Sequence, residues 1–191
     1  MGRTATPFRR GFKTEANRLA AEVRREIGLG SMDRLDPIVL AEHLAIPILA
    51  LSLFRNECSD AVRHFSGVES GAFSAVTVFD GARRSVIYND VHQSGRQSND
   101  IVHELSHGLL GHAPHVGVDG NTGCRIWHDE IEAEADFLAG ALLVPDWAAV
   151  QIVRRRMSRG SAAKAFGVSL RMIDYRLNVT GARSRAARIQ A

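Results

Sequence analysis

Apolar residues recur at helical spacing in three stretches of the chain. In residues 14–27 and 36–45 they fall three or four positions apart, and Pro37 fits the first turn of the second stretch. Residues 128–143 show the strongest such pattern, which Pro145 closes. The pattern therefore predicts three amphipathic helices.

Between these helices the pattern changes to that of strands. Residues 46–53 (IPILALSL) read as a buried strand, and residues 71–89 read as a hairpin with its turn at 80–81 (Asp-Gly). A further helix is expected over residues 96–110, followed by a glycine-rich loop over residues 112–125. This order of elements predicts an α+β fold.

Composition narrows the class of protein. The chain has 191 residues, of which 45% are apolar and 24% charged, as in ordinary globular proteins with one good-sized core. Its two cysteines, Cys58 and Cys124, form no CxxC pair and are expected to be reduced thiols. No secretory signal core and no apolar run of about 20 residues is found, so no membrane contact is expected and the cytoplasm is the expected location.

Charge is unevenly distributed along the chain. Residues 31–150 hold 7 basic and 17 acidic residues, whereas residues 151–191 hold 10 basic residues and 1 acidic residue. An acidic body with a basic tail indicates an electrostatic interaction surface, or a tail that only aids solubility.

The chemistry is concentrated in residues 103–107, His-Glu-Leu-Ser-His. On a helix, His103 and His107 lie about 40° apart around the axis and one turn apart along it, so they project from one face. Two imidazole nitrogens at that spacing can bind one tetrahedral metal ion. Glu104 lies beside that face, where its carboxylate can accept a proton from the attacking water as the catalytic base.

A hydrolytic zinc site needs three protein ligands and one open position. The third ligand is expected from the helix over residues 128–143, which offers Asp129, Glu130, Glu132, Glu134 and Asp136. Glu134 lies next to the apolar stripe and precedes the small Ala135, which permits a close approach of helices. Glu130, one turn earlier on the same side, is the alternative, and geometry favours Glu134 over Glu130.

Two strings resemble the ImmA/IrrE family of metallopeptidases. They are SNDIVHELSHGLLGH at residues 98–112 and EAEADFLAGALLVP at residues 132–145. The family pairs a HExxH helix with a later helix of the pattern E-A-x-x-F-A-x-x-L-L-x-P, and the resemblance extends over roughly residues 14–180. Three positions depart from the family pattern without touching the chemistry: Val102, Ser106 and Leu138.

The resemblance implies a zincin-like, gluzincin-like fold with a small sheet, a HExxH helix and a glutamate-bearing helix. It implies that His103, His107 and Glu134 bind Zn²⁺ and that Glu104 is the catalytic base. Mn²⁺ is an alternative metal, because the same ligands accept both ions and availability decides. The resemblance also implies a zinc endopeptidase whose substrate is a helix-turn-helix transcriptional repressor. Cleavage would then relieve repression of stress, phage or mobile-element genes.

The basic end has a pattern of its own. Residues 161–180 read as helix, turn and helix, with Gly167 in the turn and Ile173 and Leu177 as core positions. Seven cations could meet the phosphates of DNA: Arg154, Arg155, Arg156, Arg159, Lys164, Arg171 and Arg176. A packing or partner-docking role is favoured over DNA contact.

The expected division of the chain has three parts. A zincin-like domain is expected over residues 10–150, a helix-turn-helix-like module over residues 151–182, and a basic tail without regular structure over residues 183–191. Two other functions stay open, a DNA-binding regulator with a structural zinc site and a non-catalytic, antitoxin-like partner-binding module. Further candidates to stabilise an oxyanion are His112, His115, His128, Tyr88 and Tyr175.

Overall fold

The computed structural model describes residues 8–67, 69–112 and 129–190. The helices are α1 (Phe12–Glu26), α2 (Pro37–His43), α3 (Ser59–Ser66), α4 (Ser94–Leu109), α5 (Asp129–Leu143), α6 (Asp146–Arg154), α7 (Arg159–Phe166), α8 (Leu170–Val179) and α9 (Ala182–Gln190). The strands are β1 (Ile48–Ala50), β2 (Ala75–Asp80) and β3 (Arg83–Tyr88), and two short 3₁₀ helices are η1 (Leu51–Phe54) and η2 (Ser70–Ala72).

The three strands form one sheet in the order β1-β3-β2. β1 runs parallel to β3, and β2 is antiparallel to β3, with Thr77 opposite Val86. Gly81 has a φ of 58° in the turn between β2 and β3, which a glycine adopts without strain. The expected hairpin is confirmed, but its two-residue turn is Gly81-Ala82 and not Asp80-Gly81, because Asp80 still pairs with Arg83.

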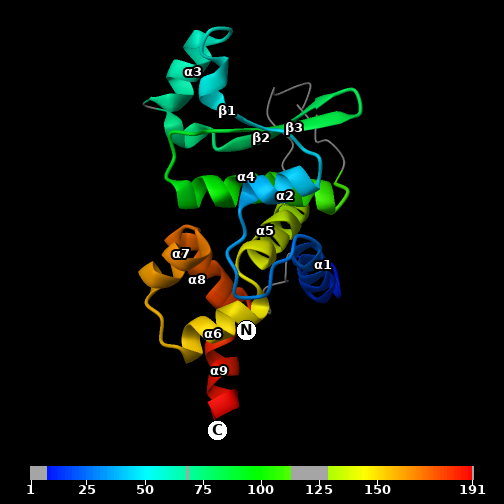
Figure 1. The fold of residues 1–191 in the computed structure, drawn as a ribbon, viewed down its shortest axis with the longest axis vertical. Helices are drawn as coiled ribbons and strands as arrows, with labels where there is room; N and C mark the ends of the chain where they lie inside the picture. Colours follow the sequence, from blue (N-terminus) through cyan, green and yellow to red (C-terminus); the bar gives the residue numbers. More distant parts are fainter. Residues whose placement is uncertain (1–7, 68, 113–128, 191) are drawn as a thin grey trace.

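Helix α4 lies between the sheet and the helical part of the molecule. Figure 1 shows the sheet on one side of α4, and α5, α1 and the C-terminal helices on the other. One apolar core joins α1, α4, α5 and α6–α9, with Val102, Leu105, Leu138 and Ile152 among its buried members. The mixed α+β fold, with its small sheet, is therefore as expected.

Local signals explain where several helices begin. Asp36 accepts a hydrogen bond from the backbone N–H of Ile38 at 2.9 Å, with Pro37 at the first helical position of α2. Ser158 and Ser169 cap α7 and α8 in the same way. These caps fix where α2, α7 and α8 begin.

The expected helix-turn-helix is present in α7 and α8. Gly167 ends α7 with a φ of 66°, and Ile173 and Leu177 are buried as core positions. The unit packs against the rest of the molecule, because a Cβ at Gly140 of α5 would lie 2.7 Å from Cδ of Arg176 on α8. The absence of a side chain at Gly140 lets α8 approach α5 closely.

Three expectations need correction. The strand expected over residues 46–53 covers Ile48–Ala50 only, and the chain then turns into η1. The tail expected to lack regular structure is the helix α9, because Ala182 and Ala186 are buried within the core. The expected boundary after residue 150 falls inside α6, which packs on both α8 and α9.

Among the described helices, none by itself is long and apolar enough to cross a membrane. Helices α5 and α6 pass that test only as a pair bent by 58°. Of the expected loop over residues 112–125, only His112 is among the described residues, so His115 and Cys124 lie outside them. His128 lies outside them too.

Candidate metal centre

The two histidines of the HExxH sequence project together from α4. Their Nε2 atoms lie 3.1 Å apart. Val102 and Leu105 are fully buried on neighbouring positions of the helix, and Gly111, with a φ of 66°, lies just beyond its end. The buried positions fix the rotation of α4, so the pair faces α5.

Glu132 of α5 completes a three-atom cluster with these histidines. Its Oε2 lies 3.2 Å from Nε2 of His103 and 3.7 Å from Nε2 of His107. Ligand atoms bound at 2.0–2.1 Å in a tetrahedral site lie about 3.3 Å apart, so this spacing and the donor set of two imidazoles and one carboxylate fit zinc. Among the described residues this is the one group of three whose ligand atoms lie within 4.8 Å of one another.

Asp136, one turn after Glu132, orients the first histidine. Nδ1 of His103 lies 2.8 Å from Oδ1 of Asp136, and because a carboxylate can only accept, this nitrogen carries the hydrogen. In the neutral ring the lone pair is then on Nε2, which faces the cluster. Such carboxylate–histidine pairs fix the ring of a metal ligand and raise its basicity.

The charges of the cluster depend on one another. Burial lowers the pKa of His103, but the hydrogen bonds to Asp136 and Glu132 outweigh burial and raise this pKa to about 10. Hydrogen bonds from His103 and His107 hold the pKa of Glu132 well below its usual range. The carboxylate of Glu132 is therefore ionised at neutral pH, as a metal ligand must be.

The structure places Glu132 where the sequence analysis placed Glu134. Residues two apart on a helix lie about 200° apart around its axis, so these two carboxylates cannot share a face. Glu134 lies 3.5 Å from Nε2 of His112 and 3.4 Å from Nε of Arg9, and burial raises its pKa. The other candidate, Glu130, is exposed at the start of α5.

The apolar stripe of α5 could not identify the third partner. From Phe137 to Leu143 every residue of α5 is buried, so this half of the helix has no polar side from which to infer its direction. Glu132 and Glu134 also both precede an alanine, Ala133 and Ala135, so the short motif fits either carboxylate. The i,i+4 pair of Glu132 and Asp136, opposite His103, is the signal that would have distinguished them.

Glu104, the expected base, lies on the side of α4 that faces the sheet. Its Oε2 accepts a 2.6 Å hydrogen bond from Oγ1 of Thr77 on β2. That contact fixes the position of the carboxylate. Strand β2 thereby positions Glu104, a role that no sequence pattern indicated for Thr77.

Comparison with known proteins identifies the family. The family model described as Peptidase_M78, IrrE N-terminal-like domain, matches residues 59–178, which is more than half of the chain and includes all the residues of the cluster. The chain belongs to this family. No curated protein is similar enough to this chain to count as a match.

In this M78 chain a third histidine lies beside the cluster. Nδ1 of His112 lies 2.9 Å from Nδ1 of His107, the ring nitrogen that faces away from Glu132. One of the two nitrogens donates to the other, and a ligand binding through Nε2 needs its Nδ1 protonated. His112 therefore acts on the orientation of His107, as Asp136 acts on that of His103.

The two tyrosines differ in their relation to the centre. Burial, with the charge of Asp136 adding to it, raises the pKa of Tyr175 on α8 to about 12. Burial and the charge of Asp90 raise the pKa of Tyr88 on β3. Both hydroxyls stay protonated at neutral pH, and the charge of Asp136 links Tyr175 to the carboxylate that orients His103.

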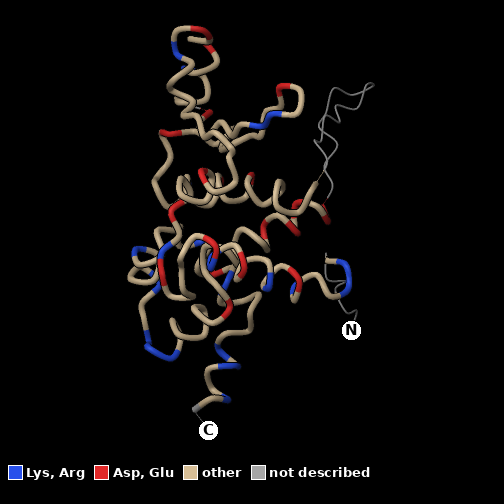
Figure 2. The backbone as a smooth tube through the Cα atoms, turned by 45° about the vertical axis from the view of Figure 1, so that its right-hand side comes forward, with Lys and Arg blue, Asp and Glu red and all other residues tan. Residues whose placement is uncertain are grey.

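The cations of the C-terminal region do not form one uniform surface. Figure 2 shows Lys and Arg recurring through this lower part of the molecule. Arg176, expected to meet phosphates, is instead fully buried, where it lies over the ring of Phe137 and donates from Nε to the carbonyl of Val144 at 2.8 Å. Arg159 is paired with Asp174. Five of the seven remain exposed without such a pair among the described residues: Arg154, Arg155, Arg156, Lys164 and Arg171.

Proposed function

We propose that this chain is a zinc-dependent endopeptidase that hydrolyses a peptide bond in a partner protein. The observation that carries the proposal is the convergence of His103, His107 and Glu132, with Glu104 held beside them by Thr77. These three side chains would hold a zinc ion, which would supply Lewis-acid chemistry: polarisation of the peptide carbonyl and activation of water at neutral pH. The same donor set accepts Mn²⁺, so metal supply in the cell decides between the two.

The chain's own residues then have distinct tasks. Glu104 accepts the proton of the attacking water and passes it to the leaving amine. Thr77 holds the carboxylate of Glu104 by donating to Oε2, while Asp136 and His112 fix the rings of His103 and His107. These contacts preorganise the site, which matters because an error of about 1 Å can cost a hundredfold in rate.

The edge of the sheet offers a place for an extended peptide. β2 pairs only with β3 among the described strands, so its other edge is open there, and it carries Thr77. An extended segment can add to such an edge through backbone hydrogen bonds. A peptide on this edge would pass close to Glu104.

The proposed substrate is a helix-turn-helix transcriptional repressor, whose cleavage would induce stress, phage or mobile-element genes. Support for this substrate comes from the resemblance of residues 98–112 and 132–145 to ImmA/IrrE peptidases. The proposal places the chain in the cytoplasm, where such a repressor acts.

DNA binding through α7 and α8 is the second candidate function. The five exposed cations named above favour it. Against it, Met172 and Tyr175 of α8 pack over Gly140 of α5, so part of the helix that would enter the major groove is already covered. Binding to a duplex that weakens steeply between 50 and about 200 mM salt would support this function.

The deciding experiment mixes the purified, zinc-loaded chain with the helix-turn-helix repressor encoded nearest its gene. A parallel reaction contains the Glu104→Gln variant, and products are read by intact mass. We expect one discrete cut by the wild type and none by the variant. No cut by a chain shown to hold one zinc would reject this substrate, and a stable complex without cleavage would favour the partner-binding module.

A further inference from the structure

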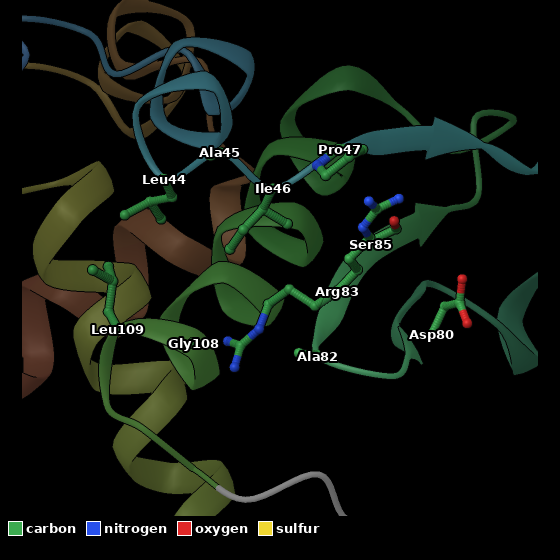
Figure 3. A pocket seen from close by; sticks show the side chains of 11 residues that line it. Leu44, Ala45, Ile46, Pro47, Asp80, Ala82, Arg83, Ser85, Gly108 and Leu109 are labelled. Atoms are coloured by element: carbon green, nitrogen blue, oxygen red, sulfur yellow. The ribbon is translucent and has the colours of Figure 1, made fainter.

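A hollow of about 810 Å³ opens where the sheet meets the C-terminal end of α4. Figure 3 shows Leu44, Ile46 and Leu109 gathered on one side of it, with Asp80 on the far side, away from Gly108. The hollow therefore has an apolar wall and a strand wall. The strand wall carries Arg83, Arg84 and Ser85 of β3.

Arg84 lies between β3 and α4. It pairs in register with Phe79 of β2, and its Cζ lies 5.3 Å from the centre of that ring. Its Nη1 occupies the place that a Cβ at Gly108 would take. The glycine after His107 thus makes room for a guanidinium at the end of α4.

These two arginines have no carboxylate partner in the part of the chain that the structure describes. Among the described residues, none lies within ion-pair distance of Arg83 or Arg84, although Asp80 is the backbone partner of Arg83 in the hairpin. Arg84 is half-buried, and a partly desolvated guanidinium without an anion gains from binding one. The hollow therefore presents bidentate donors for a carboxylate or phosphate.

The hollow is close to the proposed base. Glu104 and Gly108 are four residues apart on α4, which places them on one face about 6 Å apart along the axis. Thr77, which binds Glu104, and Phe79, which lies against Arg84, are two residues apart on β2, or about 7 Å. An extended peptide passing Glu104 would reach Arg84 within about two residues.

We propose that this hollow is a specificity pocket for an acidic side chain of the substrate, about two residues from the bond that is cut. This inference rests on the proposed peptidase function. The guanidinium of Arg84 binds the carboxylate, Arg83 adds a second positive charge, and Leu44, Ile46 and Leu109 contact the methylene groups of a glutamate. That apolar wall favours a glutamate over a nucleic-acid phosphate, which has no apolar stem.

Binding can be tested without cleavage. The zinc-loaded Glu104→Gln chain is titrated with two fluorescein-labelled decapeptide pools of neutral residues, one with a single Glu at each position in turn and one with Gln there. Fluorescence polarisation reports the affinity. We expect the best Glu pool to bind about tenfold more tightly than its Gln counterpart.

Variants assign that preference to the pocket. Arg84→Gln should abolish it, Arg84→Lys should retain part of it, and Arg83→Gln should reduce it a few-fold. Arg83 is exposed at the hairpin end, so its replacement does not endanger the fold. Arg63→Gln removes the same charge from the exposed helix α3 and should leave the preference unchanged.

Each contrary result overturns the pocket. Equal binding of the Glu and Gln pools, no binding of either pool, or a preference that survives Arg84→Gln would do so. Arg84-dependent binding of a 20-base-pair duplex in place of acidic peptides would make it a phosphate site. The two proposals fail in distinguishable ways. Cleavage of the repressor without acid selectivity rejects only the pocket, whereas acid-selective binding without any cleavage rejects the peptidase and leaves the hollow a binding site for acidic peptides.

Discussion

The two functional faces of α4 differ in how their charges are arranged. The face toward α5 carries His103 and His107, and every ring nitrogen there lies within 3.2 Å of another side chain. The face toward the sheet carries Asp100, Glu104 and Gly108 at four-residue intervals, and each meets a different group. The first face concentrates donor atoms on one point, as a metal requires, while the second spaces single groups along a line, as an extended peptide requires.

The largest expected effect tests which carboxylate belongs to the first face. Glu132→Gln should lower zinc affinity by more than about a hundredfold, because it removes a charged ligand atom, whereas Glu134→Gln should change it by less than about tenfold. Competition with a chromophoric chelator measures both. A larger loss of zinc affinity in Glu134→Gln would make Glu134 the ligand, as the sequence alone suggested. The contrast between the two faces of α4 would then not hold.

Asp136→Asn should have the next largest effect on the same face. An amide can donate to Nδ1 of His103 and so favour the wrong tautomer, and loss of such a partner costs about 10–100-fold in metal affinity. The matched control is Asp129→Asn, at the exposed start of α5, which should bind zinc like the wild type. Equal affinities of the two variants would show that Asp136 does not orient the ring.

On the second face, Thr77→Val tests the support of the base. The variant keeps the shape of the side chain but removes the hydroxyl that donates to Glu104. We expect kcat to fall about tenfold with zinc content unchanged, since a hydrogen bond to a charged group contributes about 1.5–3 kcal/mol. A fall in zinc content, or no change in kcat, would contradict a positioning role.

The smallest expected effect concerns Asp100, one turn before Glu104. Burial raises the pKa of Asp100, although Arg96 at 3.5 Å and His92 at 3.8 Å act in the opposite direction. A carboxyl whose pKa is raised in the folded state binds its proton more tightly there than in the unfolded state. Its ionised form therefore lowers the free energy of unfolding at pH 7. Asp100→Asn should therefore raise the melting temperature at pH 7, and the gain should shrink as the pH approaches 4.

Calorimetric scans of the wild type and of Asp100→Asn at pH 7 and pH 4, with equal zinc content, measure this difference in melting temperature. A lower melting temperature of Asp100→Asn at pH 7 would show that the pairs with Arg96 and His92 outweigh burial. The second face would then be held by ion pairs, like the first.

Sequence preferences that act within a few residues were enough to predict the elements that carry the candidate site residues. The i,i+4 spacing fixes His103 and His107 on one side of any helix, whatever packs around it. The hairpin and the caps of α7 and α8 follow from Asp80-Gly81, Ser158 and Ser169, because these preferences act within a few residues, although the turn itself lies one residue later, at Gly81-Ala82.

Only the tertiary structure decided which groups meet those histidines and Glu104. Residues 129–143 are one helix in either reading, but the rotation of α5 on α4 brings Glu132 and Asp136 to the site and turns Glu134 toward His112 and Arg9. That rotation depends on packing on several sides of α5 at once, including the contact of Gly140 with α8. Periodicity along one segment carries no information about such contacts, and for the same reason it could not reveal Thr77 behind Glu104 or Arg84 beside Gly108.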